Sequence, residues 1–181
     1  IPVQGDYDGD GITDKAVFRP STGVWHISGS SVGYFGGQWG NSSDTPVPAD
    51  FNGDGKTDFG IFRSGTGTWY INYTDWTTPP LTEVWGNYGD QPVATDYDAD
   101  GKADLSVWRP KTGVWLIKES DGGTYRYETL GMNGDIPVPA AYLKKVGANV
   151  AEYDFAKLRL KPINSTGGTD LYSRNFAWGT G

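Results

Sequence analysis

The chain contains the segment Asp6-Tyr7-Asp8-Gly9-Asp10-Gly11-Ile12-Thr13-Asp14 near its start, and two later segments repeat its pattern. The second copy is Asp50-Phe51-Asn52-Gly53-Asp54-Gly55-Lys56-Thr57-Asp58, and the third is Asp96-Tyr97-Asp98-Ala99-Asp100-Gly101-Lys102-Ala103-Asp104. The copies follow one another at spacings of 44 and 46 residues. Self-similarity at a fixed period of this length predicts tandem structural repeats.

The residues that follow each acidic segment repeat in the same order. A strand-like run comes first: Ala16-Val17-Phe18-Arg19-Pro20, Gly60-Ile61-Phe62-Arg63-Ser64 and Ser106-Val107-Trp108-Arg109-Pro110. A Thr-Gly-x-Trp run comes next and ends at Trp25, Trp69 and Trp115. Trp39-Gly40, Trp85-Gly86 and Leu130-Gly131 then fall in one phase. Three units are therefore related over most of their length.

The sequence of each unit predicts four short antiparallel strands. A Pro-Val segment such as Pro46-Val47-Pro48 forms the first strand, because proline is tolerated where a strand begins. The acidic segment leads to the second strand, a glycine-containing turn such as Gly65-Thr66-Gly67 leads to the third, and the fourth ends at Trp-Gly. Four strands in about 45 residues are typical of a β-propeller blade, which buries its faces against neighbouring blades. The predicted fold class is therefore all-β, a β-propeller-like array of four-stranded blades.

We expect a single repeat domain over residues 1–181, made of four units at about 1–44, 45–90, 91–135 and 136–181. The fourth unit is degenerate, because Leu143-Lys144-Lys145 replaces the acidic segment. Its residues 154–159 resemble residues 58–63 and so predict a strand. A short helix over residues 150–160 is the alternative.

The acidic segments predict calcium sites. Carboxylates at positions 1, 3, 5 and 9 would repel one another and force the segment open unless a cation lay between them. Hard oxygen ligands at alternating positions, with the carbonyl at position 7, suit calcium, which takes about six to eight oxygens. Glycine at position 6 allows the sharp turn around the ion. An EF-hand is excluded because position 12 lacks glutamate, whereas a metal-free Asp-Gly turn stays an alternative.

The three predicted calcium sites draw on side chains at positions 1, 3, 5 and 9 and on the carbonyl at position 7. They comprise Asp6, Asp8, Asp10, Asp14 and the Ile12 carbonyl; Asp50, Asn52, Asp54, Asp58 and the Lys56 carbonyl; and Asp96, Asp98, Asp100, Asp104 and the Lys102 carbonyl. Asp75 lies outside these segments, and its replacement by alanine is expected to change little.

These residues resemble the calcium-binding FG-GAP/VCBS repeats of integrin-like β-propellers. The resemblance rests on Asp-x-Asp-x-Asp-Gly-x-x-Asp followed by Ala-Val-Phe-Arg-Pro-Ser-Thr-Gly-x-Trp, and it covers about residues 1–140. It implies an extracellular or cell-surface module in which calcium rigidifies the blade loops. Such propellers usually have seven blades, and four fit here. Residues 158–176 are similar to the stretch that precedes Rhs/YD-repeat regions in large bacterial surface proteins, which implies a part of a longer chain.

Composition excludes several other classes of function. The formal net charge of −7 argues against a nucleic-acid partner, which would need a basic patch. Three calcium ions would bring this charge to about −1. The chain has no cysteine and one histidine, His26, so thiol, zinc and histidine-dependent chemistry are not expected. No apolar stretch reaches the ~18–20 residues of a membrane helix, so no membrane insertion is expected. No nucleophile–base set can be assembled, so we expect a protein that is not an enzyme.

The remaining repeated residues predict structural roles. We expect Arg19, Arg63 and Arg109 to brace neighbouring carboxylates or loops, and Trp25, Trp69 and Trp115 to form the core between blades. His26 is expected to be structural. Less regular aromatic residues are expected to be exposed contacts; they are Tyr34, Tyr73, Trp76, Tyr88, Tyr125 and Tyr127.

Together these features predict a calcium-stabilised extracellular or cell-surface module for structure, assembly or adhesion, with other copies of itself or other surface proteins as partners. Open blade faces would expose apolar surface, so we expect the units to close as a four-blade ring or to stack between chains as a filament. The alternative function is a carbohydrate-binding lectin or adhesin that binds glycans with the loops between blades.

Overall fold

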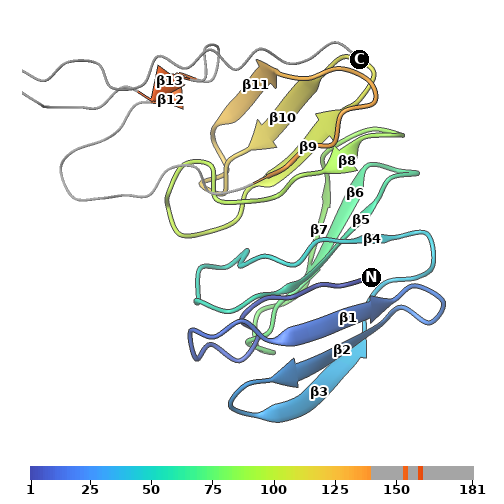
Figure 1. Cartoon of the computed structure of the whole chain (residues 1–181), viewed down its shortest axis with the longest axis vertical. Helices are drawn as coiled ribbons and strands as arrows, with labels where there is room; N and C mark the ends of the chain where they lie inside the picture. Colours follow the sequence, from blue (N-terminus) through green and yellow to red (C-terminus); the bar gives the residue numbers. More distant parts are fainter. Residues whose placement is uncertain (140–152, 155–158, 161–181) are drawn as a thin grey trace, which may run out of the picture. The chain divides into compact units, whose positions relative to one another are not determined.

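The computed structural model describes residues 1–139, 153–154 and 159–160, and all of its regular structure is antiparallel β (Figure 1). The chain divides into two units, residues 1–142 and 143–181, which are considered separately. Of the second unit the structure describes two short paired strands, β12 (Tyr153–Asp154) and β13 (Arg159–Leu160). These four residues are extended, where the alternative had predicted a helix. Residues 136–139, at the start of the predicted fourth unit, are also described and form no strand, and the other residues of that unit lie outside the described part of the chain.

The first unit contains three successive sheets, one for each acidic segment. The first has the order β1 (Lys15–Arg19), β2 (Val24–Gly29), β3 (Gly33–Gln38). The second has the order β4 (Thr45–Pro46), β5 (Phe59–Arg63), β6 (Thr68–Asn72), β7 (Leu81–Val84). The third comprises β8 (Gln91–Pro92), β9 (Leu105–Arg109), β10 (Val114–Lys118) and β11 (Tyr125–Thr129), in chain order across the sheet. The predicted all-β, β-propeller-like array is confirmed, with four strands in the second and third sheets and three in the first.

The first sheet differs from the other two at the position of its first strand. Pro46 pairs with Ile61 and Pro92 with Val107 within regular strands, whereas Pro2 forms an isolated bridge to Val17. The amide of Val3 still donates to the Ala16 carbonyl at 3.0 Å, as the amides of Val47 and Val93 do in their own sheets. Pro2 and Val3 therefore take the place that a short first strand has in the other two sheets.

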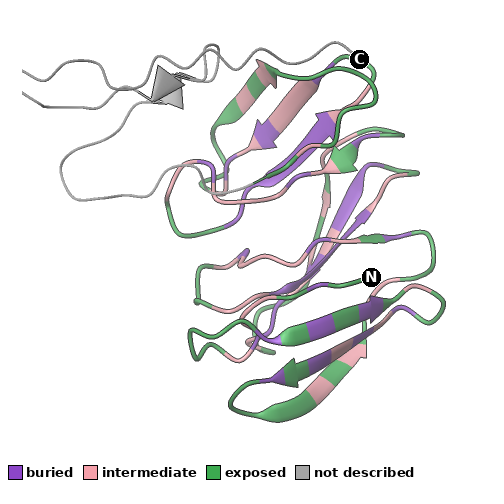
Figure 2. Ribbon diagram, in the orientation of Figure 1, coloured by how far each residue is buried: buried purple, intermediate pink, exposed green. Residues whose placement is uncertain are grey.

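Adjacent sheets pack through apolar side chains: buried and exposed residues alternate along β1, whereas β5 is buried on both faces (Figure 2). One buried cluster, between the first two sheets, consists of Val3, Tyr7, Ala16, Phe18, Trp25, Ile27, Phe59 and Ile61. The other, between the second and third sheets, consists of Val47, Phe51, Phe62, Trp69, Ile71, Tyr73, Ala103, Leu105 and Val107. Because each blade contributes to a core only together with its neighbour, the sheets depend on one another for stability.

Polar contacts also join consecutive blades. The indole N–H of Trp39 donates to the Tyr70 carbonyl, and that of Trp85 donates to the Leu116 carbonyl, each at 3.2 Å. The predicted arginine braces are confirmed for Arg63, which binds Asp44 at 2.8 Å, and for Arg109, which binds Asp90 at 2.9 Å. The closing tryptophan of one blade is thus held by the third strand of the next.

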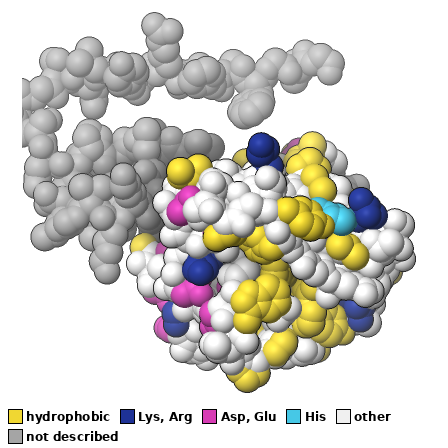
Figure 3. Space-filling view, turned by 90° about the horizontal axis from the view of Figure 1, so that it is seen from below, with side chains coloured by type: hydrophobic (Ala, Val, Ile, Leu, Met, Phe, Trp, Pro, Cys, Tyr) yellow, Lys and Arg dark blue, Asp and Glu magenta, His cyan; other side chains and the backbone are white. Residues whose placement is uncertain are grey.

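The outer face of the first sheet carries exposed apolar side chains. Val17, the counterpart of the buried Ile61 and Val107, is 48% exposed. Tyr34 on the same face is exposed, and its hydroxyl lies 2.8 Å from His26 Nδ1, which fits the structural role predicted for this histidine. Figure 3, which views the molecule from below Figure 1, shows hydrophobic side chains and the histidine gathered on one face.

The turn between the second and third strands of a blade depends on one glycine. Gly67 has φ +65°, and a Cβ there would lie 2.2 Å from the carbonyl oxygen of Gly86. We expect Gly67→Ala to lower the free energy of unfolding by about 2–4 kcal/mol, from left-handed strain and the overpacked contact. Gly65→Ala in the same turn is the matched control, because nothing lies within 4 Å of its Cβ position. Urea denaturation measures both, and equal effects would contradict this role of Gly67.

Candidate metal centres

Each acidic loop connects the first and second strands of its blade and is closed at its base by a bridge. The bridges join Gly5 to Asp14, Ala49 to Asp58 and Thr95 to Asp104. The ninth position of each loop therefore lies directly before the second strand of its blade, and the first eight positions form the projecting turn. The sequence folds this way because Gly11, Gly55 and Gly101 at position 6 have φ between +83° and +94°.

Four hydrogen bonds recur in all three loops. The carboxylate at position 1 accepts from the amides at positions 4 and 6, the side chain at position 3 accepts from the amide at position 5, and the carboxylate at position 5 accepts from the amide at position 7. In the first loop these bonds are 2.7, 2.8, 3.3 and 2.8 Å long, and the other two loops repeat them. The side chains of positions 1, 3 and 5 are therefore turned inward by the backbone itself.

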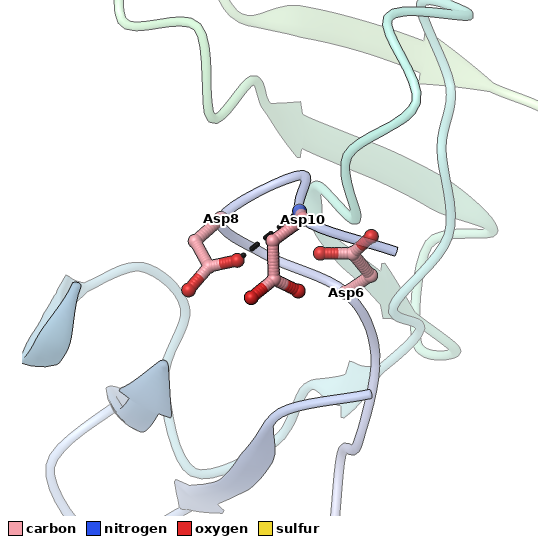
Figure 4. A group of neighbouring side chains, drawn as sticks. All are labelled: Asp6, Asp8 and Asp10. Carbon is pink, nitrogen blue, oxygen red and sulfur yellow. Dashed lines mark hydrogen bonds between the residues drawn. The ribbon is translucent and has the colours of Figure 1, made fainter. Parts of the chain in front are cut away.

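The structure brings carboxylates together in the first and third loops. Oxygen atoms of Asp6, Asp8 and Asp10 lie within 4.8 Å of one another, and the three side chains face a common space (Figure 4). In the third loop Asp96, Asp98 and Asp104 form such a group. Among the described residues the second loop holds no such trio of acids, and Asn52 stands at its third position. Hard oxygens in this arrangement fit a calcium ion.

The aspartates at position 9 are buried and hold the loop against the turn after the third strand. Asp58 accepts from the amides of Phe51 and Thr74, each at 2.9 Å. Asp14 and Asp104 accept from the matching amides of Tyr7 and Ser30, and of Tyr97 and Ser120. These three carboxylates therefore brace the loop, in addition to the ligand role predicted for them.

Burial changes the proton affinity of two of these aspartates. Desolvation raises the pKa of Asp58 and of Asp104 to about 6, although their backbone N–H partners oppose the rise. Desolvation, with the nearby charges of Asp100, Glu119 and Asp96, also raises the pKa of Asp98. Crowded, partly desolvated carboxylates cost free energy in their charged form, and a bound cation would offset that cost.

Neighbouring loops touch along the edge of the sheets. The amide of Thr57 donates to the Asp6 carbonyl at 2.6 Å, and the amide of Ala103 donates to the Asp50 carbonyl at 2.7 Å. The Lys56 side chain lies against Gly9, where an added Cβ would be 2.9 Å from its Cε. Each loop is thus in contact with the next through the peptide group whose carbonyl, that of Lys56 or Lys102, is predicted to bind calcium.

The structure gives the positions of the aromatic residues for which the sequence predicted burial or exposure. Trp25 and Trp69 are buried between blades, as predicted, and Trp115 is half-buried on the far side of the third sheet. Tyr34, Trp76, Tyr88, Tyr125 and Tyr127 are exposed, as predicted. The prediction for Tyr73 was wrong: it is 9% exposed and belongs to the core between the second and third sheets, because it continues the inward face of β6.

Sequence reasoning missed the residues that approach the loops from the turn after the third strand. Ser31 donates to Asp8 through its amide and its hydroxyl, and Ser120 donates through its hydroxyl to Asp100. Asp75 lies 3.3 Å from the amide nitrogen of Asn52. Three hydrogen-bond donors from Thr77 and Thr78 hold the pKa of Asp75 at about 2. The structure therefore places Asp75 beside the second loop, and the small effect expected of its replacement by alanine stays a prediction.

Comparison with known proteins gives one family match. Residues 50–107 match the family model described as FG-GAP-like repeat, a range that begins at the second acidic loop and ends within β9. No curated protein and no solved structure gave a significant match. The match covers less than half of the chain, and it supports FG-GAP-like character for the second and third loops.

Proposed function

We propose that this chain is a calcium-stabilised extracellular module that serves structure, assembly or adhesion, without enzymatic activity. The observation that carries the proposal is the shared frame of the three loops, in which backbone amides orient the side chains of positions 1, 3 and 5 in each blade. Modules of the FG-GAP type are typical of extracellular proteins. In the part of the chain that the structure describes, no helix is of a length and hydrophobicity to cross a membrane.

Calcium would act on the loops and, through them, on the blades. The carboxylates of positions 1, 3 and 5 would hold the ion, and its charge would offset their mutual repulsion. The position-9 aspartates connect each loop to the turn after the third strand, and the Thr57 and Ala103 amides connect each loop to the preceding one. A filled site would therefore stiffen its own blade and the contact between blades.

The exposed apolar face of the first sheet favours assembly. Val17 and Tyr34 lie on this face, and the corresponding faces of the second and third sheets are buried against a neighbouring blade (Figure 3). Other copies of this chain or other surface proteins would cover such a face. Closure as a four-blade ring and stacking into a filament both stay predictions.

Calcium titration by calorimetry tests the proposal, with an expected stoichiometry of three ions per chain. We expect Asp54→Ala to reduce this number to two, because Asp54 is the position-5 carboxylate of the second loop and also orients the Lys56 amide at 2.8 Å. Asp121→Ala is the matched control, because this exposed acid binds Gly123 and Thr124 within its own turn. A wild-type chain that takes up no calcium would refute the proposal, and three ions bound by Asp54→Ala would refute the assignment of the second site.

Carbohydrate binding is the second candidate function. Among the described residues, five aromatic side chains outside the core are exposed: Tyr34, Trp76, Tyr88, Tyr125 and Tyr127. Exposed aromatic rings can stack against sugars, since they offer apolar area with a polar tip. A glycan array probed in the presence of calcium separates this function from a purely structural one.

A further inference from the structure

The contact between consecutive blades is built in the same way twice. In each case the Trp-Gly pair that closes one blade lies against the second and third strands of the next. The indole N–H of Trp39 donates to the Tyr70 carbonyl, and that of Trp85 donates to the Leu116 carbonyl, each at 3.2 Å and each across 31 residues. A carbonyl oxygen has two lone pairs, so a strand carbonyl can accept an indole N–H in addition to a bond within its sheet. The two contacts therefore occupy equivalent positions of the repeat.

The glycine of each pair packs closely on the central side chain of the next second strand. A Cβ added at Gly40 would lie 3.3 Å from Cδ1 of Ile61, and one added at Gly86 would lie 3.3 Å from Cγ1 of Val107. Ile61 and Val107 are both buried. The lack of a side chain at this glycine thus lets the closing segment approach the sheet and cover its apolar centre.

The first sheet has the same site on its outer face, where Val17 is 48% exposed. Equivalent positions of the three sheets hold one cross-strand pair each: Val17 with His26, Ile61 with Tyr70, and Val107 with Leu116. Val17, His26 and Tyr34 line a hollow of about 430 Å³ on this face, and hydrophobic side chains gather near the histidine in Figure 3. The first sheet therefore presents, uncovered in the described part of the chain, the surface on which a Trp-Gly pair lies in the other two sheets.

One residue of this face indicates that its partner comes from another molecule. Lys15 stands where the second strands of the other blades have Phe59 and Leu105. Phe59 and Leu105 are buried between blades, whereas Lys15 is exposed. A charged residue suits a face that is in contact with water part of the time, because a terminal repeat needs a polar outer surface for solubility. The face is therefore suited to a reversible contact and not to a permanent core.

We propose that this face binds the Trp178-Gly179 pair of a second copy of the chain, with the indole N–H donated to the His26 carbonyl and the glycine packed on Val17. This inference rests on the proposed function and names the segment that joins one copy to the next. The chain contains three Trp-Gly pairs, of which Trp39-Gly40 and Trp85-Gly86 form contacts between its own blades. Trp178-Gly179 is the third pair and lies outside the described residues. Because the face and the segment are different surfaces, copies would join head to tail.

The test uses full-length variants that each block one half of the contact. Val17→Lys places a charge on the receiving face, and Trp178→Ala removes the inserted ring. In calcium, sedimentation velocity of the wild-type chain should show assemblies that grow as the concentration is raised. Each variant alone should sediment as a single chain. An equimolar mixture of the two should form a dimer with one copy of each, because one intact face and one intact Trp-Gly pair remain.

Matched variants separate this contact from a general effect on folding or solubility. Val84→Lys changes another exposed strand valine, and Trp76→Ala removes another exposed tryptophan. Both should assemble as the wild-type chain does. Trp178→Phe keeps an aromatic ring but loses the N–H, and it should weaken the contact about tenfold, as expected for one lost hydrogen bond. This variant serves if Trp178→Ala does not fold.

The outcomes separate this inference from the proposed function. A wild-type chain that sediments as a single chain at every concentration, assembly that survives Val17→Lys, or a mixture that forms no dimer would overturn the role of this face. Equal loss of assembly in Val84→Lys or Trp76→Ala would overturn it as well. Each of these results leaves calcium binding intact, whereas a wild-type chain that takes up no calcium would refute the proposed function instead.

Discussion

Removal of divalent cations is expected to lower the melting temperature of this chain by roughly 8–16 °C. The reason is that an ion bound only to the folded loops stabilises the native state by mass action. With free calcium tenfold above the dissociation constant, each site contributes about 1.4 kcal/mol, or about 4 kcal/mol for three sites. For a chain of this length, 1 kcal/mol shifts the melting temperature by about 2–4 °C. Millimolar calcium provides such an excess if the sites fall at the tighter end of the ~10⁻⁴–10⁻³ M range of extracellular modules.

Differential scanning calorimetry in calcium, in excess chelator and after calcium is restored measures this effect. Sodium chloride at matched ionic strength is the control, because salt alone screens repulsion among the exposed carboxylates. The melting temperature should fall when calcium is removed and return to its first value when calcium is restored. Coincident melting curves in calcium and in chelator would contradict cation stabilisation of all three loops.

Much of the fold could be predicted from the repeats, because the repeat period gives the length of each blade and the strand-like runs give the positions of its strands. The positions of Val17, Ile61 and Val107 in the second strands were predicted, and the structure has them in β1, β5 and β9. Contacts between blades were not predictable in detail, because the indole bonds of Trp39 and Trp85 reach carbonyls 31 residues away. Tyr73 was misplaced because its segment varies between blades and hides the continuing alternation of β6.

The loops were predictable because the side chains that would bind a cation lie within one short segment of each repeat. Positions 1, 3 and 5 alternate within five residues, and the structure brings Asp6, Asp8 and Asp10 together accordingly. Asp75 could not be found this way, because it approaches Asn52 across 23 residues of intervening strands. The available signal was Asn52, which stands where the other two loops have aspartate. This departure alone resembles ordinary sequence variation, and only the strand register brings Asn52 to Asp75.

Trp69→Ala is expected to lower the free energy of unfolding by about 3–5 kcal/mol, the range for a buried tryptophan truncated to alanine. Trp69 is fully buried, with its ring centroid 5.1 Å from that of Phe62 and 6.4 Å from that of Phe51. Its indole N–H also donates to the Trp85 carbonyl at 2.8 Å, so truncation leaves that carbonyl without this partner. Two adjacent blades lose a shared contact, because Trp69 belongs to the cluster that includes Leu105 and Val107.

Urea denaturation in saturating calcium measures this loss without a contribution from partly filled sites. Tyr88→Ala removes an aromatic ring that is 82% exposed and should change the free energy of unfolding by less than about 0.5 kcal/mol. If Trp69→Ala had as small an effect, the blades would not share the core described above. If Trp69→Ala also weakened calcium binding at the second loop, its destabilising effect would extend to Asp58, which directly precedes β5. That result would show that the packing between blades and the geometry of the loops are one cooperative unit, as the Thr57 and Ala103 bonds between loops lead us to expect.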